Sequence, residues 1–267
     1  MKRFGLVLLM VVSALMAGAL LLAACGGEEE GGLVPPGAQA TQPAEAGEAE
    51  GAVAEEEEDG GGIETDLDVL DSYRFKSTTE MKQGDSVASC KVEVTSVVAS
   101  HGTDKKMVAE ETVDGAKKEA GCIVVGEDAW VLEDGEWTEG GRADCEQTYE
   151  DWIFESAACL EPQNLADFVP DDPSSLKGTF DTVNGIKTLH YSLSKADLER
   201  LWPEDFGGES ASGLRDASLD LWIAKDGRHL VRVRAEARGQ DEEGEVWSRV
   251  EAEVSNVNDE SLEIEAP

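Results

Sequence analysis

The sequence predicts an α+β protein built on one strongly bent antiparallel sheet, a half-barrel of about ten or eleven strands with short helices packed on its concave face. Apolar and polar residues alternate with a period of two through most of residues 67–267. Asp-Gly and Asn-Gly pairs separate the alternating segments, which is typical of antiparallel hairpins. Helical spacing is confined to the stretches near residues 145–168 and 195–202, so these must cover the apolar face of the sheet.

The first half of this region is predicted to form consecutive hairpins. In residues 87–99, Cys90 and Val92 fall on one face while Lys91 and Glu93 fall on the other. The same alternation predicts further strands in this half over residues 73–81, 107–113, 122–125 and 129–132, with another beginning at Trp137. The turn signals between them are Gln83-Gly84, Asp114-Gly115 and Asp134-Gly135.

The next segment loses this period and predicts two short helices, or a helix and a loop. Its large apolar residues recur at roughly helical spacing: Tyr149, Trp152, Ile153, Phe154, Leu160, Leu165 and Phe168. Pro162 interrupts the pattern, and Pro170 ends it.

Strands resume at residues 178–183, and Asn184-Gly185 predicts a hairpin to residues 186–193. Ser194 with Asp197 resembles a capping box, which predicts a short helix that Pro203 ends. Alternation then predicts a final meander over residues 219–224, 231–238 and 246–254.

The N-terminus predicts export and lipidation. Met1-Lys2-Arg3 precedes an apolar run from Phe4 to Ala24, which is typical of a signal peptide over residues 1–24. Leu22-Ala23-Ala24-Cys25 resembles a bacterial lipobox, in which Cys25 is diacylated and becomes the first mature residue. The alternative is a retained membrane-spanning signal anchor. We expect an extracytoplasmic protein held in the outer leaflet of the cell membrane, because two acyl chains give durable attachment.

An acidic tether is predicted over residues 25–66. After Cys25 it has thirteen acidic residues, no Lys or Arg, and almost no large apolar residues, so we expect disorder. The formal charge of the whole chain is −36, and residues 67–267 hold 45 acids against 20 Lys and Arg. This balance argues against nucleic-acid binding and favours a domain held away from anionic headgroups.

Four cysteines remain: Cys90, Cys122, Cys145 and Cys159. An even number outside the cytoplasm predicts two disulfides with three possible connectivities, and the absence of a C-x-x-C pair disfavours zinc. Pairing Cys145 with Cys159 closes the shortest loop between neighbouring cysteines, and Cys90 with Cys122 then follows by elimination. A predicted strand lies between those last two, which strains that pairing.

The sequence predicts no catalytic residue, metal site or cofactor. His101, His190 and His229 fall in separate strands or turns without metal-ligand spacing. No nucleophile elbow, P-loop or dinucleotide-binding glycine pattern is present. We therefore do not expect an enzyme.

Three stretches resemble one family. The stretches are Val124-Val125-Gly126-Glu127-Asp128-Ala129-Trp130 with Gly135-Glu136-Trp137, Asn184-Gly185-Ile186-Lys187-Thr188-Leu189-His190-Tyr191, and Leu221-Trp222-Ile223-Ala224-Lys225-Asp226-Gly227. They are similar to hairpins of the LolA/LolB-like superfamily, closest to its LppX/LprAFG branch. Ala224 stands where Asp is common. The resemblance implies a half-barrel enclosing an apolar cavity for acyl chains, and it implies carriage of lipid or lipoprotein. It names no ligand-binding residue, because the family has no fixed ligand motif.

We therefore expect a lipid-anchored carrier of a lipid or other apolar ligand. The alternative is a non-catalytic envelope interaction or scaffold lipoprotein, whose core is filled and whose partner is an envelope protein. A ligand-filled cavity would favour the carrier, whereas an exposed apolar patch would favour the scaffold.

Overall fold

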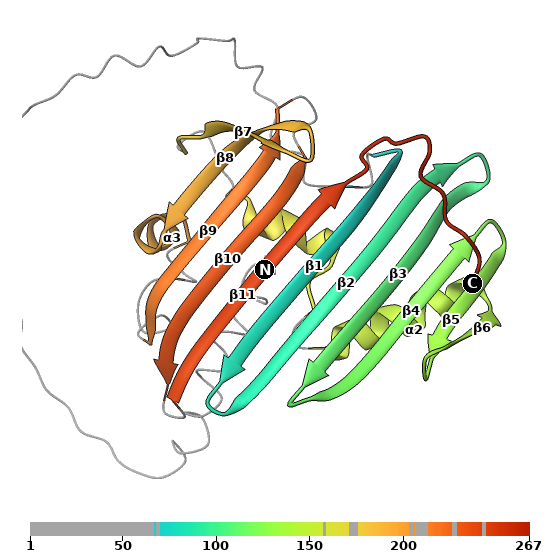
Figure 1. Cartoon of the computed structure of the whole chain (residues 1–267), viewed down its shortest axis with the longest axis horizontal. Coiled ribbons are helices and arrows are strands. Elements are labelled where there is room, and N and C mark those ends of the chain that lie inside the picture. The colour runs from blue at the N-terminus through green and yellow to red at the C-terminus, as the bar shows by residue number, and fades with distance from the viewer. Residues whose placement is uncertain are drawn as a thin grey trace, which may run out of the picture.

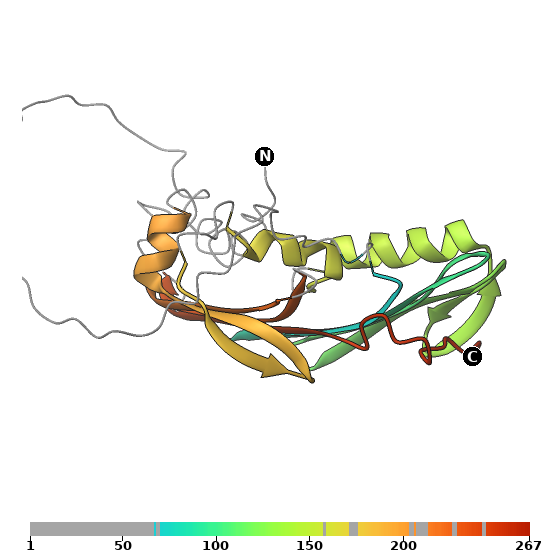
Figure 2. The same ribbon diagram turned by 90° about the horizontal axis from the view of Figure 1, so that it is seen from above.

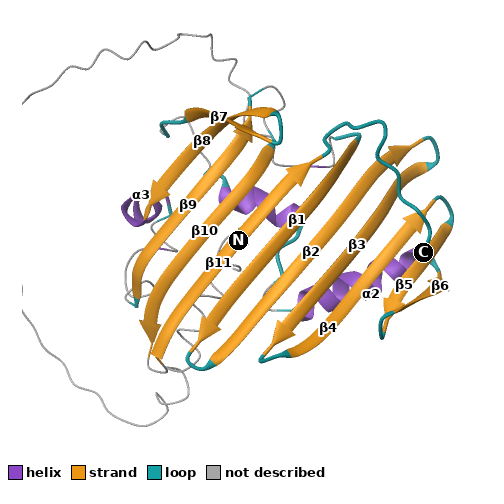
Figure 3. Cartoon of the chain, in the orientation of Figure 1, coloured by secondary structure: helices purple, strands orange, loops and turns teal. Residues whose placement is uncertain are grey.

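The structure is a computed structural model that describes residues 67, 70–156, 159–170, 176–202, 206, 213–225, 229–241 and 244–267. These residues form one open eleven-stranded antiparallel sheet with three short helical segments (Figures 1 and 3). The predicted half-barrel fold is therefore confirmed. The predicted signal peptide, Cys25 and the acidic tether lie outside the described residues.

The strands follow in space the order β6-β5-β4-β3-β2-β1-β11-β10-β9-β8-β7. Their bounds are β1 Ser72–Gln83, β2 Ser86–Ala99, β3 Gly102–Val113, β4 Ala116–Val125, β5 Asp128–Glu133, β6 Glu136–Gly140, β7 Thr179–Val183, β8 Ile186–Ser194, β9 Leu214–Ala224, β10 Leu230–Asp241 and β11 Gly244–Ser255. Most neighbours are joined by hairpins, whereas β1 and β11 pair across most of the chain, with Thr79 opposite Val250. This pairing joins the two halves of the molecule into one sheet.

The predicted hairpin turns have the backbone that their residues favour. Asp114-Gly115, Asp134-Gly135 and Asn184-Gly185 all have positive φ at both positions, as a two-residue turn with the twist of the strands requires. Strands β3 and β4 begin earlier than predicted, at Gly102 and Ala116. The first residues of both strands are rich in Lys, Asp and Glu, so apolar alternation could not predict them as strand. They are strand in the structure because they pair with residues of the neighbouring strands.

All three helical segments lie on the concave face of the sheet (Figure 2). Helix α2 (Arg142–Glu155) contacts β4 and β5, the 3-10 helix η2 (Pro162–Phe168) contacts β10, and α3 (Lys195–Leu201) contacts β8 and β9. The capping box is confirmed, because the Ser194 hydroxyl accepts from the Asp197 amide and the Asp197 carboxylate accepts from the Ser194 amide. The C-terminal segment after β11 runs along the opposite, convex face (Figures 1 and 2).

Candidate functional site

The concave face is apolar along the central strands. On β1, β10 and β11 the residues that point to this face are buried or half-buried, while the alternate residues are mostly charged and point to the convex face. The buried cluster joins this face to Tyr149 of α2, Leu165 and Phe168 of η2, and Leu198 of α3. The helical segments therefore cover the apolar side of the sheet, as predicted.

A row of short side chains crosses this face, which we call the small-residue row. The strand registers place Ala88, Met81, Ser248, Ala237 and Ala217 opposite one another on β2, β1, β11, β10 and β9. Met81 is the one long side chain among them. Five adjacent strands span about 19 Å, so the row is about 19 Å long and one residue wide, and most of its side chains rise only a short way above the sheet.

Two disulfides join the concave roof to the sheet, and their pairing differs from the predicted one. Cys90 bonds to Cys159 and Cys122 to Cys145, with Cα–Cα distances of 5.1 and 5.3 Å. The predicted Cys145–Cys159 pair was wrong because Cys145 lies near the start of α2 and Cys159 beyond its end, so roughly 15 Å of helix separates these two cysteines. The predicted Cys90–Cys122 pair was wrong because β3 lies between β2 and β4, which separates those strands by about 10 Å.

Helix α2 is consequently attached to the sheet at both ends. Cys145 lies at the end of its first turn and bonds to β4, and Cys159 lies four positions beyond its last residue, Glu155, and bonds to β2. The Ser156 hydroxyl adds a hydrogen bond of 2.7 Å to Glu111 of β3. The roof over β2 to β5 is therefore held covalently, whereas no disulfide holds η2 or α3 within the described ranges.

A buried carboxyl group lies at the junction between α2 and η2. Glu161 is 8% exposed and accepts a hydrogen bond of 2.7 Å from Nε2 of Gln163. Burial, together with the negative charge of Glu150, raises the pKa of Glu161 to about 7. Burial and the nearby Glu161 also raise the pKa of Tyr149, whose hydroxyl has no hydrogen-bond partner among the described residues. We therefore expect this junction to respond to pH near neutrality.

Hydroxyl groups interrupt the apolar lining beside this junction. The buried Ser77 hydroxyl donates to the carbonyl oxygen of Leu160 at 2.7 Å, which fixes the chain just before η2 onto β1. Thr79, two residues further along β1, is 2% exposed, and no hydrogen bond to its hydroxyl is found within the part of the chain that the structure describes. Thr79 is thus a buried polar group that a ligand placed on this face could satisfy.

The histidines do not come together. His101 bonds to Asp104 at 2.8 Å, His190 bonds to Asp220 at 2.9 Å and stacks on Trp222, and His229 is buried elsewhere. Within the described ranges, no three His, Cys, Asp or Glu side chains are grouped so that they could hold a metal ion. Over the same residues, no helix combines the length and apolar character needed to cross a membrane.

No protein-family model matches the chain, and no curated protein matches it. Among solved structures, LprF from Mycobacterium bovis aligns over 74% of this chain and 90% of its own, at 14% identity and a TM-score of 0.37. A DUF1329 family protein from Desulfovibrio piger aligns over 73% and 89%, at 14% identity and a TM-score of 0.24. A domain described as an outer membrane lipoprotein-sorting protein, from Vibrio parahaemolyticus, aligns over 72% and 87%, at 8% identity and a TM-score of 0.20.

These structures include LprF, whose name places it in the LppX/LprAFG branch that the sequence motifs resemble, and a lipoprotein-sorting domain. All three TM-scores lie below 0.5, however, so these superpositions carry no argument about what this chain binds.

Proposed function

We propose that the protein is a lipid-anchored extracytoplasmic lipoprotein that binds a lipid or other apolar ligand against the concave face of its sheet. The observation that carries the proposal is the small-residue row. Its side chains are short on four of the five strands it crosses, with Met81 on the fifth, and a track about 19 Å long and one residue wide suits an extended hydrocarbon chain. The hydroxyl of Thr79, in the neighbouring row, is available to the polar end of such a ligand. The role is binding, without catalysis.

The domain division belongs to the same proposal. Residues 1–24 are the signal peptide, Cys25 carries the acyl chains, residues 26–66 are the tether, and residues 67–267 are the binding domain. Support comes from the lipobox-like Leu22-Ala23-Ala24-Cys25 and from the acidic composition that follows it. Metabolic labelling with a radioactive fatty acid should mark the wild-type chain and leave the Cys25→Ser variant unlabelled and released from membranes.

Native mass spectrometry tests the ligand. The full chain with Cys25→Ser is purified without detergent, so that no anchor retains bulk membrane lipid. Stoichiometric co-purifying lipid, identified after solvent extraction, is the expected result. A ligand-free mass, together with no uptake of fluorescent fatty acid, contradicts the carrier and favours the envelope scaffold with a filled core.

A matched pair of variants locates the ligand. Ala217 points to the concave face and is buried, whereas its neighbour Ser218 is exposed on the convex face. Ala217→Phe should displace the lipid while the chain remains folded, and Ser218→Phe should leave lipid binding unchanged. If the core is already filled, Ala217→Phe instead overpacks it and costs about 1–3 kcal/mol of stability.

A further inference from the structure

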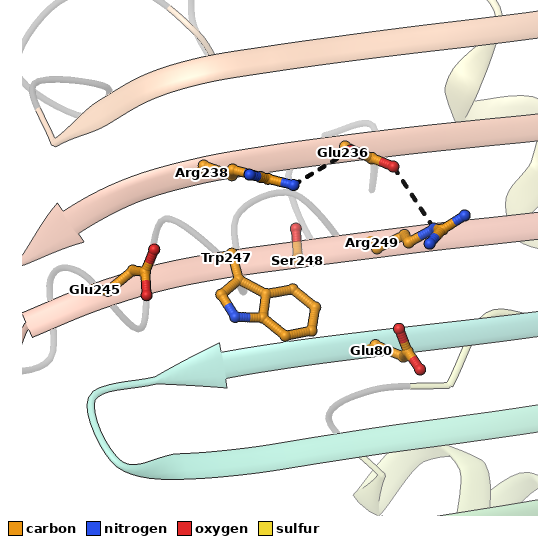
Figure 4. Close-up of a pocket in the computed structure, with 7 residues that line it drawn as sticks. All are labelled: Glu80, Glu236, Arg238, Glu245, Trp247, Ser248 and Arg249. Atoms are coloured by element: carbon orange, nitrogen blue, oxygen red, sulfur yellow. Dashed lines mark ion pairs between the residues drawn. The ribbon is translucent and has the colours of Figure 1, made fainter.

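The convex face of the sheet carries a groove that the proposed lipid site does not use. It has a volume of about 290 Å³ and crosses β1, β10 and β11 (Figure 4). Its lining consists of Glu80, Glu236, Arg238, Glu245, Trp247, Ser248 and Arg249. Trp247 and Arg249 alternate along β11 with the buried Val246, Ser248 and Val250, so their side chains point away from the concave face. The groove and the small-residue row therefore lie on opposite faces of one sheet.

Trp247 forms the aromatic part of this groove. Its indole extends from β11 toward β1 (Figure 4), and the register places it between Lys82 and Arg238. Trp247 is half-buried, so part of the indole remains accessible from the groove. An indole offers a broad apolar surface and one N–H donor, which suits a ligand that is apolar on its face and polar at its edge.

The charged groups around Trp247 retain capacity for hydrogen bonds. Among the residues drawn in Figure 4, ion pairs join Glu236 to Arg249 at 3.6 Å and to Arg238 at 3.9 Å, both longer than a good hydrogen bond. Glu80 and Glu245 take no part in those pairs. Carboxylate acceptors and guanidinium donors thus surround the indole, and each is open to a new partner.

The charge balance selects the class of ligand. The lining has three carboxylates and two guanidinium groups, and the ammonium of Lys82 lies 3.7 Å from Glu245. The groove is therefore close to neutral although residues 67–267 carry 45 acids against 20 Lys and Arg. An anionic ligand would be repelled by Glu80 and Glu245, and a cationic ligand would be repelled by Arg238 and Arg249. A neutral ligand that carries many hydroxyl groups meets neither penalty.

We propose that this groove binds a neutral saccharide. One sugar ring stacks its C–H face on Trp247, and its hydroxyl groups bond to Glu80, Glu236 and Arg249. The volume lies just below the usual range of about 300–1,000 Å³ for small-molecule sites, which suits one or two sugar rings, and we expect weak binding. Such binding would hold the convex face against a glycan and leave the concave face free.

The test follows the Trp247 indole N–H resonance by NMR in the full chain with Cys25→Ser. The probes are chitotriose, maltotriose, cellotriose and mannotriose, each titrated to millimolar concentrations, with phosphocholine and inorganic phosphate as charged probes. The expected result is a saturable shift of this resonance with at least one trisaccharide and no shift with the charged probes. No shift with any trisaccharide overturns the proposal, and so does a shift with a charged probe alone.

Variants connect the binding to the groove. Saturation-transfer signals on the bound sugar should fall at least about tenfold in Trp247→Ala and clearly in Glu80→Gln, which keeps the size of the side chain. Lys91→Ala, on the convex side of β2 and outside the groove, is the control and should bind as the wild type does. If Trp247→Ala does not fold, Trp247→Leu replaces it. Equal sugar signals in the wild type and in the folded Trp247 and Glu80 variants would overturn the proposal.

Discussion

At the scale of single residues, Glu161 is a carboxyl group whose buried position disfavours its charged form. It lies buried between α2 and η2, accepts one hydrogen bond from Gln163, and feels the negative charge of Glu150. Its ionisation therefore opposes the packing of η2 against the sheet. Because the pKa rises from 4.5 to about 7 on folding, Glu161 favours the folded state at low pH, and this advantage is lost as the pH rises toward 7.

The variant Glu161→Gln should remove this dependence. At low pH the two proteins should have similar stability, and above about pH 7 the variant should be more stable by on the order of 3 kcal/mol. Urea unfolding across this pH range measures the difference. Glu155→Gln, an exposed carboxylate of α2, is the control and should follow the wild type. A stability difference that does not grow with pH would contradict the assignment.

At the scale of elements, the disulfides distinguish α2 from the rest of the roof. Cys90–Cys159 spans 69 positions and Cys122–Cys145 spans 23, so the first constrains a larger loop of the unfolded chain. Helices η2 and α3 have no such bonds within the described residues and rely on packing of Leu165, Phe168 and Leu198. We therefore expect the proposed ligand to enter beside η2 or α3 more easily than beneath α2.

Removing each disulfide should show this order. Replacing Cys90 and Cys159 together by Ala should lower the free energy of unfolding by about 1 kcal/mol more than replacing Cys122 and Cys145 together by Ala. The loss expected for each disulfide is about 3–4 kcal/mol. Denaturant unfolding gives the stability. Hydrogen exchange should show faster exchange in α2 after either removal and little change in α3. Faster exchange in α3 alone would contradict the role of the disulfides in the roof.

At the scale of the whole molecule, the described domain carries a large excess of acidic residues. Residues 67–267 carry 45 acids and 20 Lys and Arg, while Arg232, Arg234 and Arg249 are grouped with Glu251 on the convex face. Those half-buried pairs remain partly open to solvent and contribute little individually, whereas repulsion among the remaining acids acts throughout the fold. Screening should therefore stabilise this protein.

The melting temperature of the full chain with Cys25→Ser should rise between about 0.01 M and 0.3 M sodium chloride, as the Debye length falls from about 30 Å to below 8 Å. Differential scanning calorimetry measures it. Potassium chloride at equal ionic strength is the control for ion-specific effects and should give the same rise. A melting temperature that falls with salt would show that the ion pairs outweigh the repulsion.

Local features of this molecule could be predicted because short-range physics decides them. Asn184-Gly185 adopts the positive-φ turn, Ser194 caps α3, and alternation in β11 separates buried from exposed residues. The candidate sites could not be predicted in this way. The small-residue row exists only because pairing of β1 with β11 places Met81 opposite Ser248, 167 positions apart in the chain.

The sequence by itself determined the fold class, the hairpin turns, the two helical regions and the presence of two disulfides. Each follows from the periodicity, turn chemistry or cysteine number of a segment read alone. Tertiary structure alone decided which cysteines pair, that Glu161 is buried, and that Trp247, Glu80 and Arg238 of three different strands line one groove. These depend on strand register and on where the helices lie, which are set by packing between residues distant in the chain.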